Sequence, residues 1–220
     1  MQGEADLRSA EGFIAAELRA EFPGLRLDWV TVRVSPQPTP RELKHRLRDL
    51  SSRYRGAQVV AMRTQPIPHA YRTFFRQIGL NPDVRRIPSE QAALHRLLHG
   101  QFTSRNLIDD ARLVALIETG VPVWALDAGV VDAGGLGIRL TVAGDRLGSS
   151  DQADHLPPGR LAVADANNIH ALLFDDEVAP GHRVAPRTER VALFAIGVDG
   201  VPRIHIEEAL FICIETLEGR

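Results

Sequence analysis

The strongest constraint on the fold is a change in hydrophobic pattern near residue 100. Before that point, apolar residues recur mostly at helical spacing, as Leu43, Leu47 and Leu50 do within residues 40–55. After it, one helical segment precedes several short β-like runs separated by Gly-containing turns. No Pro-, Gly- or Ser-rich linker, low-complexity segment or repeat interrupts the 220 residues. The pattern therefore predicts one mixed α/β (α+β) domain, with a central, mostly antiparallel or mixed sheet flanked by helices.

The same periodicities predict the individual elements. Helices are expected over residues 4–20, 40–55, 68–78, 88–99, 104–120 and 204–217. Strands are expected over 25–34 and 57–62, and within 121–127, 137–144, 159–166, 169–175 and 190–198. Residues 58–200 are expected to form the core of the domain, with 1–57 as an N-terminal extension packed on it and 201–220 as a C-terminal segment.

Composition places the chain among intracellular globular proteins. Apolar residues make up 44% and charged residues 25% of the chain, and Cys213 is the single cysteine, which fits a reducing cytoplasm. We expect no signal peptide, no membrane span and a cytoplasmic location. The sequence does not indicate an oligomeric state.

Charge is distributed unevenly along the chain. Residues 1–100 hold 16 Lys and Arg against 10 Asp and Glu, giving +6, whereas residues 101–220 hold 10 against 18, giving −8. Such a division can place a basic face beside an acidic pocket, or it can be sequence scatter.

Residues 66–82, "PIPHAYRTFFRQIGLNP", predict an amphipathic helix bounded by prolines and Gly79. Its apolar side chains share one face: Tyr71, Phe74, Phe75 and Ile78. We expect these rings to pack in the core, because an aromatic ring must be exposed to stack on a nucleotide base. Arg72 and Arg76 occupy another face, where they are available to RNA phosphates or to a carboxylate partner, or are simply solvated.

From Tyr71 onward the sequence resembles the editing module of the bacterial phenylalanyl-tRNA synthetase beta subunit, and stand-alone proteins built on it. The resemblance rests on "YRTFFRQIGLNPDVRRIPSEQAALHRLLHG", "NLIDDARLVALIETGVPVWALDAG", "GRLAVADANN" and "APRTERVALFAIGVDG". It covers residues 58–200 and depends on the order and spacing of these motifs together.

The resemblance implies the fold of that module and an aminoacyl-tRNA hydrolase acting in trans. The synthetase module hydrolyses the ester of mischarged tyrosyl-tRNA. Such a site needs a polar pocket for the amino acid, a positioned water and donors for the oxyanion, with no metal or organic cofactor. The implied partners are tRNA and an amino acid or aminoacyl ester.

At two places the sequence departs from the synthetase pattern. Ala111 and Arg112 stand where the module has Thr-Asn in its editing pocket. Trp124 stands where the module has a histidine, which replaces a hydrogen-bonding group with a large apolar ring. These departures indicate a different amino acid or ester, or a binding module that retains the fold without catalysis.

Two polar groups are the main candidates for the site. Asn106 and Asp109 begin a predicted helix, where they border the pocket, cap the helix, or do both. We expect Arg112 and Trp124 to contact substrate as well. Asp165, Asn167 and His170 follow a predicted strand, either as a site in which Asp165 and His170 position a water, or as a polar turn.

Two further segments are weaker candidates. Asp175 and Asp176 suit recognition of an α-ammonium group, although a solvated loop explains them equally simply. His95 and His99 have the i, i+4 spacing of metal ligands on a helix, but no third ligand is evident. We therefore assign no metal site and keep a metal-dependent enzyme only as an alternative hypothesis.

Overall fold

Two antiparallel strands, β3 (Arg26–Arg33) and β8 (Arg190–Gly197), run through the centre of the fold. The computed structural model describes residues 9–34, 36–54, 56–150, 153, 155–174 and 178–219. β3 and β8 pair over their full lengths, from Arg26 opposite Gly197 to Arg33 opposite Arg190. β1 (Ala10–Glu11) pairs with the outer edge of β3, and β4 (Val123–Asp127) with the outer edge of β8. The result is a four-stranded antiparallel sheet of order β1-β3-β8-β4.

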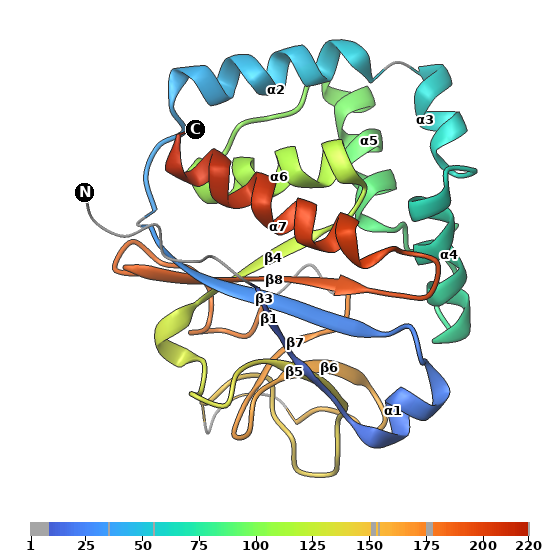
Figure 1. Ribbon diagram of the computed structural model, residues 1–220, viewed down its shortest axis with the longest axis vertical. Helices are drawn as coiled ribbons and strands as arrows, with labels where there is room; N and C mark the ends of the chain where they lie inside the picture. Colours follow the sequence, from blue (N-terminus) through green and yellow to red (C-terminus); the bar gives the residue numbers. More distant parts are fainter. Residues whose placement is uncertain are drawn as a thin grey trace.

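A second four-stranded sheet lies below the first in Figure 1. Its order is β2 (Phe13–Ile14), β5 (Gly137–Leu140), β6 (Leu161–Ala164) and β7 (Ile169–Leu172). β2 runs parallel to β5 and the other pairs are antiparallel, so this sheet is mixed. The chain passes from β1 to β2 at Gly12, where a Cβ atom would lie 2.5 Å from the carbonyl oxygen of Leu136. Only glycine permits this close crossing between the sheets.

Helices cover the face of the first sheet that points away from the second (Figure 1). The described helices are α1 (Ala16–Glu21), α2 (Arg41–Arg53), α3 (Gly56–Met62), α4 (Pro66–Gln77), α5 (Pro88–His99), α6 (Leu107–Thr119) and α7 (Arg203–Glu218). α6 and α7 pack against each other, and α7 lies directly on β8 and β3. α1 instead lies near the second sheet (Figure 1).

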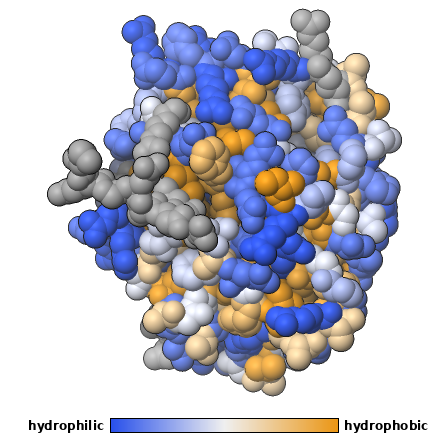
Figure 2. Space-filling model, in the orientation of Figure 1, coloured by the Kyte–Doolittle hydropathy of each residue, from blue (hydrophilic) through white to orange (hydrophobic). Residues whose placement is uncertain are grey.

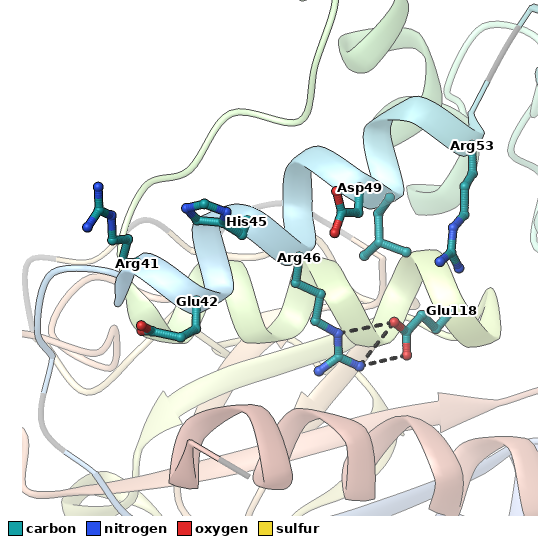
Figure 3. Close-up of a pocket in the computed structure, with 8 residues that line it drawn as sticks. Arg41, Glu42, His45, Arg46, Asp49, Arg53 and Glu118 are labelled. Carbon is teal, nitrogen blue, oxygen red and sulfur yellow. Dashed lines mark hydrogen bonds and ion pairs between the residues drawn. The ribbon is translucent and has the colours of Figure 1, made fainter.

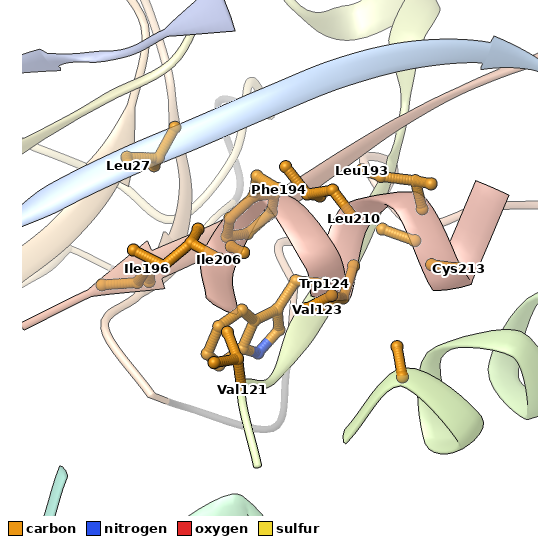
Figure 4. Close-up of a cluster of buried hydrophobic side chains, with 14 of the residues drawn as sticks. Leu27, Val121, Val123, Trp124, Leu193, Phe194, Ile196, Ile206, Leu210 and Cys213 are labelled. Atoms are coloured by element: carbon orange, nitrogen blue, oxygen red, sulfur yellow. The ribbon is translucent and has the colours of Figure 1, made fainter. Parts of the chain in front are cut away.

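The main core includes buried side chains on both faces of the first sheet. Figure 4 shows part of it, with Phe194 and Ile196 of β8, Ile206 and Leu210 of α7, and Trp124 of β4. Each of these five side chains is buried. Cys213 is also buried here, and burial raises the pKa of its thiol to about 12, which keeps it protonated and unreactive.

The predicted core face of α4 is confirmed. Tyr71, Phe74 and Phe75 are buried, and the ring of Phe174 lies 5.1–5.9 Å from each of their ring centroids. The Tyr71 hydroxyl donates a hydrogen bond to the carbonyl oxygen of Ile196 at 2.7 Å, which ties α4 to β8. These rings are therefore structural.

The expectation of a mixed α/β single domain is confirmed, while three local predictions are wrong. Residues 57–62 lie in α3 instead of a strand, with Met62 buried and Val60 exposed, as on a helix with one inward face. The described part of 4–20 contains two short strands before α1, because the chain changes sheets at Gly12. Residues 1–57 are not an added layer, since β3 is an interior strand.

In Figure 2, hydrophilic residues dominate the upper edge, where α2 lies in Figure 1. None of the described helices is both long enough and apolar enough to cross a membrane.

Candidate functional site

The structure separates the predicted site residues into two groups. Asp109, Arg112 and Trp124 line one cleft between α5, α6 and the start of β4. Asp165, Asn167 and His170 lie on the β6–β7 turn and on β7, and none of these three lines that cleft. Asp175 and Asp176, also predicted to bind substrate, lie outside the described residues.

The cleft has a volume of about 480 Å³ and a mixed lining. Its apolar wall includes Trp124 and Phe174, whose ring centroids lie 5.7 Å apart in an edge-on contact. Trp124 also stacks on Phe194 at 5.6 Å with an interplanar angle of 12°, which fixes the orientation of the indole. The indole therefore forms a wall of the cleft without filling it.

Phe174 is held in a conformation that side chains other than glycine rarely adopt. Its φ angle is +57°, in the left-handed region, and its carbonyl oxygen accepts a hydrogen bond from Arg85 Nη2 at 3.1 Å. Backbone strain of this kind persists where the surrounding packing fixes the residue and often marks a functional position.

The charged wall of the cleft begins at the helix cap of α6. The Asn106 side-chain oxygen accepts hydrogen bonds from the backbone N–H groups of Ile108 and Asp109 at 3.1 and 3.0 Å, so the capping interpretation is confirmed. The Asn106 amide also donates to Asp109 Oδ2 at 2.7 Å. Arg112 donates to Asp109 Oδ1 at 3.1 Å and to the carbonyl oxygen of Val123 at 2.7 Å. The cap thus orients the carboxylate and the guanidinium that line the cleft.

His95 of α5 lines the cleft as well, although no sequence signal placed it there. Burial, followed by the electrostatic effects of His99 and Arg105, lowers the pKa of His95 below its ordinary value of 6.5. The imidazole is therefore neutral at pH 7 and able to accept a proton. The ring centroids of His95 and His99 lie 4.2 Å apart, with the ring planes tilted by 42°. Across the described ranges, no three His, Cys, Asp or Glu residues are arranged to hold a metal ion.

The second group forms a buried chain of hydrogen bonds. Asp165 Oδ2 lies 2.8 Å from His170 Nε2, His170 Nδ1 lies 2.9 Å from His182 Nδ1, and His182 Nε2 lies 3.1 Å from Ser149 Oγ. Asp165, His170 and His182 are buried, whereas Ser149 is exposed. We call these four residues the Ser149 relay. His182 and Ser149 were not predicted, because they join the pair only through the tertiary fold.

Asp165 is also anchored by the backbone. Its Oδ1 atom accepts hydrogen bonds from the N–H groups of Asn167 and Asn168, and its Oδ2 atom accepts one from Asp132. Burial raises the pKa of the carboxyl group, but these three N–H donors and His170 lower it by more, so the net shift is downward. Asp165 is therefore a carboxylate. The side chain of Asn167 bonds that of Asp132 and so closes the turn.

Burial lowers the pKa values of the two histidines, whereas burial alone would raise that of Asp165. Desolvation is the largest influence on both rings, and the pKa values of His170 and His182 lie below 6.5 although Asp165 opposes the shift. At neutral pH both rings are uncharged, which determines how protons are placed along the relay.

Of the alternatives for Arg72, the structure has the carboxylate partner, which leaves this side chain unavailable to RNA. Arg72 is buried, and its guanidinium donates to both oxygens of Glu90 at 2.8 and 2.9 Å and to Asp83 at 2.6 Å. Arg76 is exposed on α4, so its expected contact with RNA remains a prediction.

A basic helix that the sequence analysis did not single out is α2. Its exposed basic side chains are Arg41, Lys44, His45, Arg48 and Arg53. Figure 3 shows several of these around a shallow pocket, where Arg46 makes a two-pronged ion pair with Glu118 at 2.9–3.0 Å. On the other side of α2, a hollow is bordered by Arg41, Lys44 and Arg48 together with the segment 101–104.

A scan against protein-family models and a search of curated proteins gave no match to this sequence.

Proposed function

We propose that this protein binds the aminoacyl ester at the end of a tRNA in the cleft between α5, α6 and β4, and hydrolyses that ester in trans. One observation carries the proposal. Asp109, Arg112 and Trp124, which the resemblance to the synthetase editing module assigns to substrate, line the same cleft. Its volume of about 480 Å³ lies within the range of small-molecule sites, roughly 300–1,000 Å³.

The lining suits an aminoacyl group. Asp109 supplies a fixed negative charge for the α-ammonium group, since Asn106 and Arg112 hold its carboxylate in place. Trp124 and Phe174 offer an apolar wall for the amino-acid side chain. A substrate with an apolar or aromatic side chain therefore fits the cleft best.

His95 provides a base for hydrolysis. The neutral imidazole takes a proton from a water molecule as the water oxygen attacks the ester carbonyl carbon. The bond between that carbon and the ribose oxygen then breaks, the ribose oxygen takes up the proton, and a free amino acid leaves. The predicted pair Asp165 and His170 plays no part in this step, because it lies outside the cleft lining.

The basic helix α2 supports an RNA partner. The segment 101–105 borders both the cleft, through Phe102 and Arg105, and the hollow beside Arg41 and Lys44. An RNA strand lying along α2 would therefore reach the cleft across this segment. Because phosphate contacts release counterions, such binding weakens steeply as salt rises.

Binding without hydrolysis is the second candidate function. Trp124 occupies the place where the synthetase module has a histidine, so the cleft retains binding groups while the base must come from His95 on a different helix. Retained binding together with absent turnover would select this alternative.

Tryptophan fluorescence tests the binding step. Trp29 and Trp124 are the two tryptophans, so the Trp29→Phe variant reports on the cleft alone. We expect non-hydrolysable 3′-aminoacylamino adenosine analogues to change its emission saturably. In the same background, Asp109→Asn should weaken binding at least about tenfold through loss of the ammonium contact. Asp49→Asn, which removes an exposed carboxylate of α2 outside the cleft, should leave binding unchanged. Emission that responds to no analogue would exclude the cleft as the aminoacyl site.

A further inference from the structure

We infer that Ser149 is a nucleophilic serine that reacts with acyl esters, with His182 as its base and with His170 and Asp165 positioning that base. The inference rests on the three contacts of the Ser149 relay, at 3.1, 2.9 and 2.8 Å. It is independent of the proposed function, because none of the four residues lines the cleft.

The backbone around β7 brings the relay together. The Gly148 N–H donates to the carbonyl oxygen of Ile169 at 2.8 Å, which holds the Ser149 segment beside β7. On the other side, the Ala179 N–H donates to the carbonyl oxygen of His170 at 2.7 Å. The His182 N–H then bonds the Ala179 carbonyl oxygen at 3.0 Å. Ser149 and His182 are thus tied to the same strand through separate hydrogen bonds.

Gly148 allows the Ser149 segment to lie close to His182. Its φ angle is +95°, and a Cβ atom there would lie 3.2 Å from the Cβ of Ala179 and 3.3 Å from the carbonyl oxygen of Pro180. A larger residue would push the Ser149 segment away from His182. The position therefore requires glycine both for its backbone conformation and for space.

The protons along the relay follow from its charge states. Asp165 is a carboxylate and can only accept, so His170 carries its proton on Nε2. His170 is neutral, so its Nδ1 accepts from His182 Nδ1–H. His182 is also neutral, which leaves its Nε2 lone pair to accept the hydroxyl proton of Ser149. The resting relay is therefore aligned for proton transfer from Ser149 to His182.

The reaction follows from this alignment. Ser149 Oγ bonds to the ester carbonyl carbon while its proton moves to His182 Nε2. The bond from that carbon to the alcohol oxygen then breaks, and the departing alcohol takes the proton from His182. Water next attacks the acyl-serine with His182 again as base, releasing a carboxylic acid and restoring the hydroxyl. Asp165 stabilises the imidazolium through His170, as a buried carboxylate does in other serine hydrolases.

The exposed position of Ser149 indicates the substrate class. Ser149 is an exposed residue, and the other three residues of the relay are buried behind it. The site therefore suits small, accessible acyl esters.

Labelling with a fluorophosphonate probe tests the inference. Attack by Ser149 forms a bond from Oγ to phosphorus and expels fluoride, and the adduct is located by intact mass and peptide mapping. We expect one adduct on Ser149, lost in Ser149→Ala and retained in the neighbouring Ser150→Ala. His182→Gln should slow labelling by at least about 100-fold, since a general base contributes roughly 10²–10⁴ in rate. An adduct at another residue, or equal labelling of a natively folded His182→Gln variant, would overturn the assignment.

The pH dependence of the labelling rate distinguishes a role of Asp165 in positioning the base from a purely structural role. The labelling rate should rise as His182 loses its proton, with an inflection below pH 6.5. Asp165→Asn removes a charge that raises the pKa of His182, so both the rate and the inflection pH should fall. An unchanged inflection in Asp165→Asn would show that Asp165 does not act on the base. An aminoacyl analogue that fills the cleft should leave the labelling rate unchanged, so a failure here is distinct from a failure of the proposed function.

Discussion

His170 and His182 face each other through their Nδ1 atoms at 2.9 Å, with both rings buried. One nitrogen must donate and the other must accept, so the contact requires at least one neutral ring. Protonating both rings would place two donors and two positive charges against each other. The stability of this part of the molecule is therefore linked to pH.

We predict that the free energy of unfolding falls as pH falls below about 6.5. Burial lowers the pKa of both histidines from the ordinary 6.5, so below that value the unfolded chain binds protons that the native state does not. The stabilisation is complete above pH 6.5 and is lost toward the native pKa values, at no more than about 1.4 kcal/mol per pH unit for each ring. Urea denaturation between about pH 7.5 and 5.5 measures the slope, and ring-nitrogen NMR assigns it to these histidines. A flat profile would contradict the proton assignment.

The buried pair of Arg72 and Glu90 should contribute far more to stability than a surface pair. Each side chain is 7% exposed, so Glu90→Gln leaves a buried guanidinium without its main partner, at a cost of about 3 kcal/mol. The control is Glu118→Gln, which breaks the more exposed pair with Arg46 and should cost less than about 1 kcal/mol. Denaturant unfolding measures both values. Equal costs would mean that Asp83, the other partner of Arg72, compensates for the lost carboxylate, or that Arg72 reaches solvent.

Asn106→Ala should destabilise α6 by about 1 kcal/mol, because two backbone N–H groups lose their capping oxygen. Asn106→Ser should restore most of that loss, since serine also caps helices. Only asparagine, however, donates its amide to Asp109, so neither variant should bind the aminoacyl analogue as tightly as the wild type. Thermal unfolding and the fluorescence titration measure the two effects separately. Full affinity in Asn106→Ala would remove Asn106 from the site.

Gly148→Ala and Gly144→Ala form a matched pair. Both glycines have positive φ angles, +95° and +98°, so each variant should lose roughly 1–2 kcal/mol through backbone strain. An added Cβ meets Ala179 at position 148, whereas nothing lies within 4 Å at position 144. Only Gly148→Ala should therefore slow fluorophosphonate labelling of Ser149. Equal labelling of the two variants would show that contact with His182 does not activate Ser149.

The sequence predicted the elements whose signals are local. The spacing of Leu43, Leu47 and Leu50 predicted α2, and the prolines and glycine around residues 66–82 predicted α4. The same approach failed at 57–62, because a short apolar run does not distinguish a strand from a helix. It also treated 1–57 as an extension, because the partner of β3 lies more than 150 residues along the chain.

The candidate site residues also divide into those with local sequence signals and those that only the tertiary fold brings together. Asn106 with Asp109, and Asp165 with His170, were predicted as groups because three and five residues separate their members. Ser149 and His182 are 33 residues apart, and only the approach of two loops at Gly148 joins them. The burial of Arg72 was missed for a similar reason, since it depends on Glu90 in the next helix.

The most direct test of the central claim is deacylation of a panel of mischarged aminoacyl-tRNAs by the full chain. We predict that at least one ester, with an apolar or aromatic amino acid, is hydrolysed well above the uncatalysed rate. His95→Gln should slow that reaction by about 100-fold, whereas His99→Gln, which alters a histidine outside the cleft lining, should not. Turnover of no ester in the panel, or equal rates for His95→Gln and wild type, would contradict hydrolysis in this cleft.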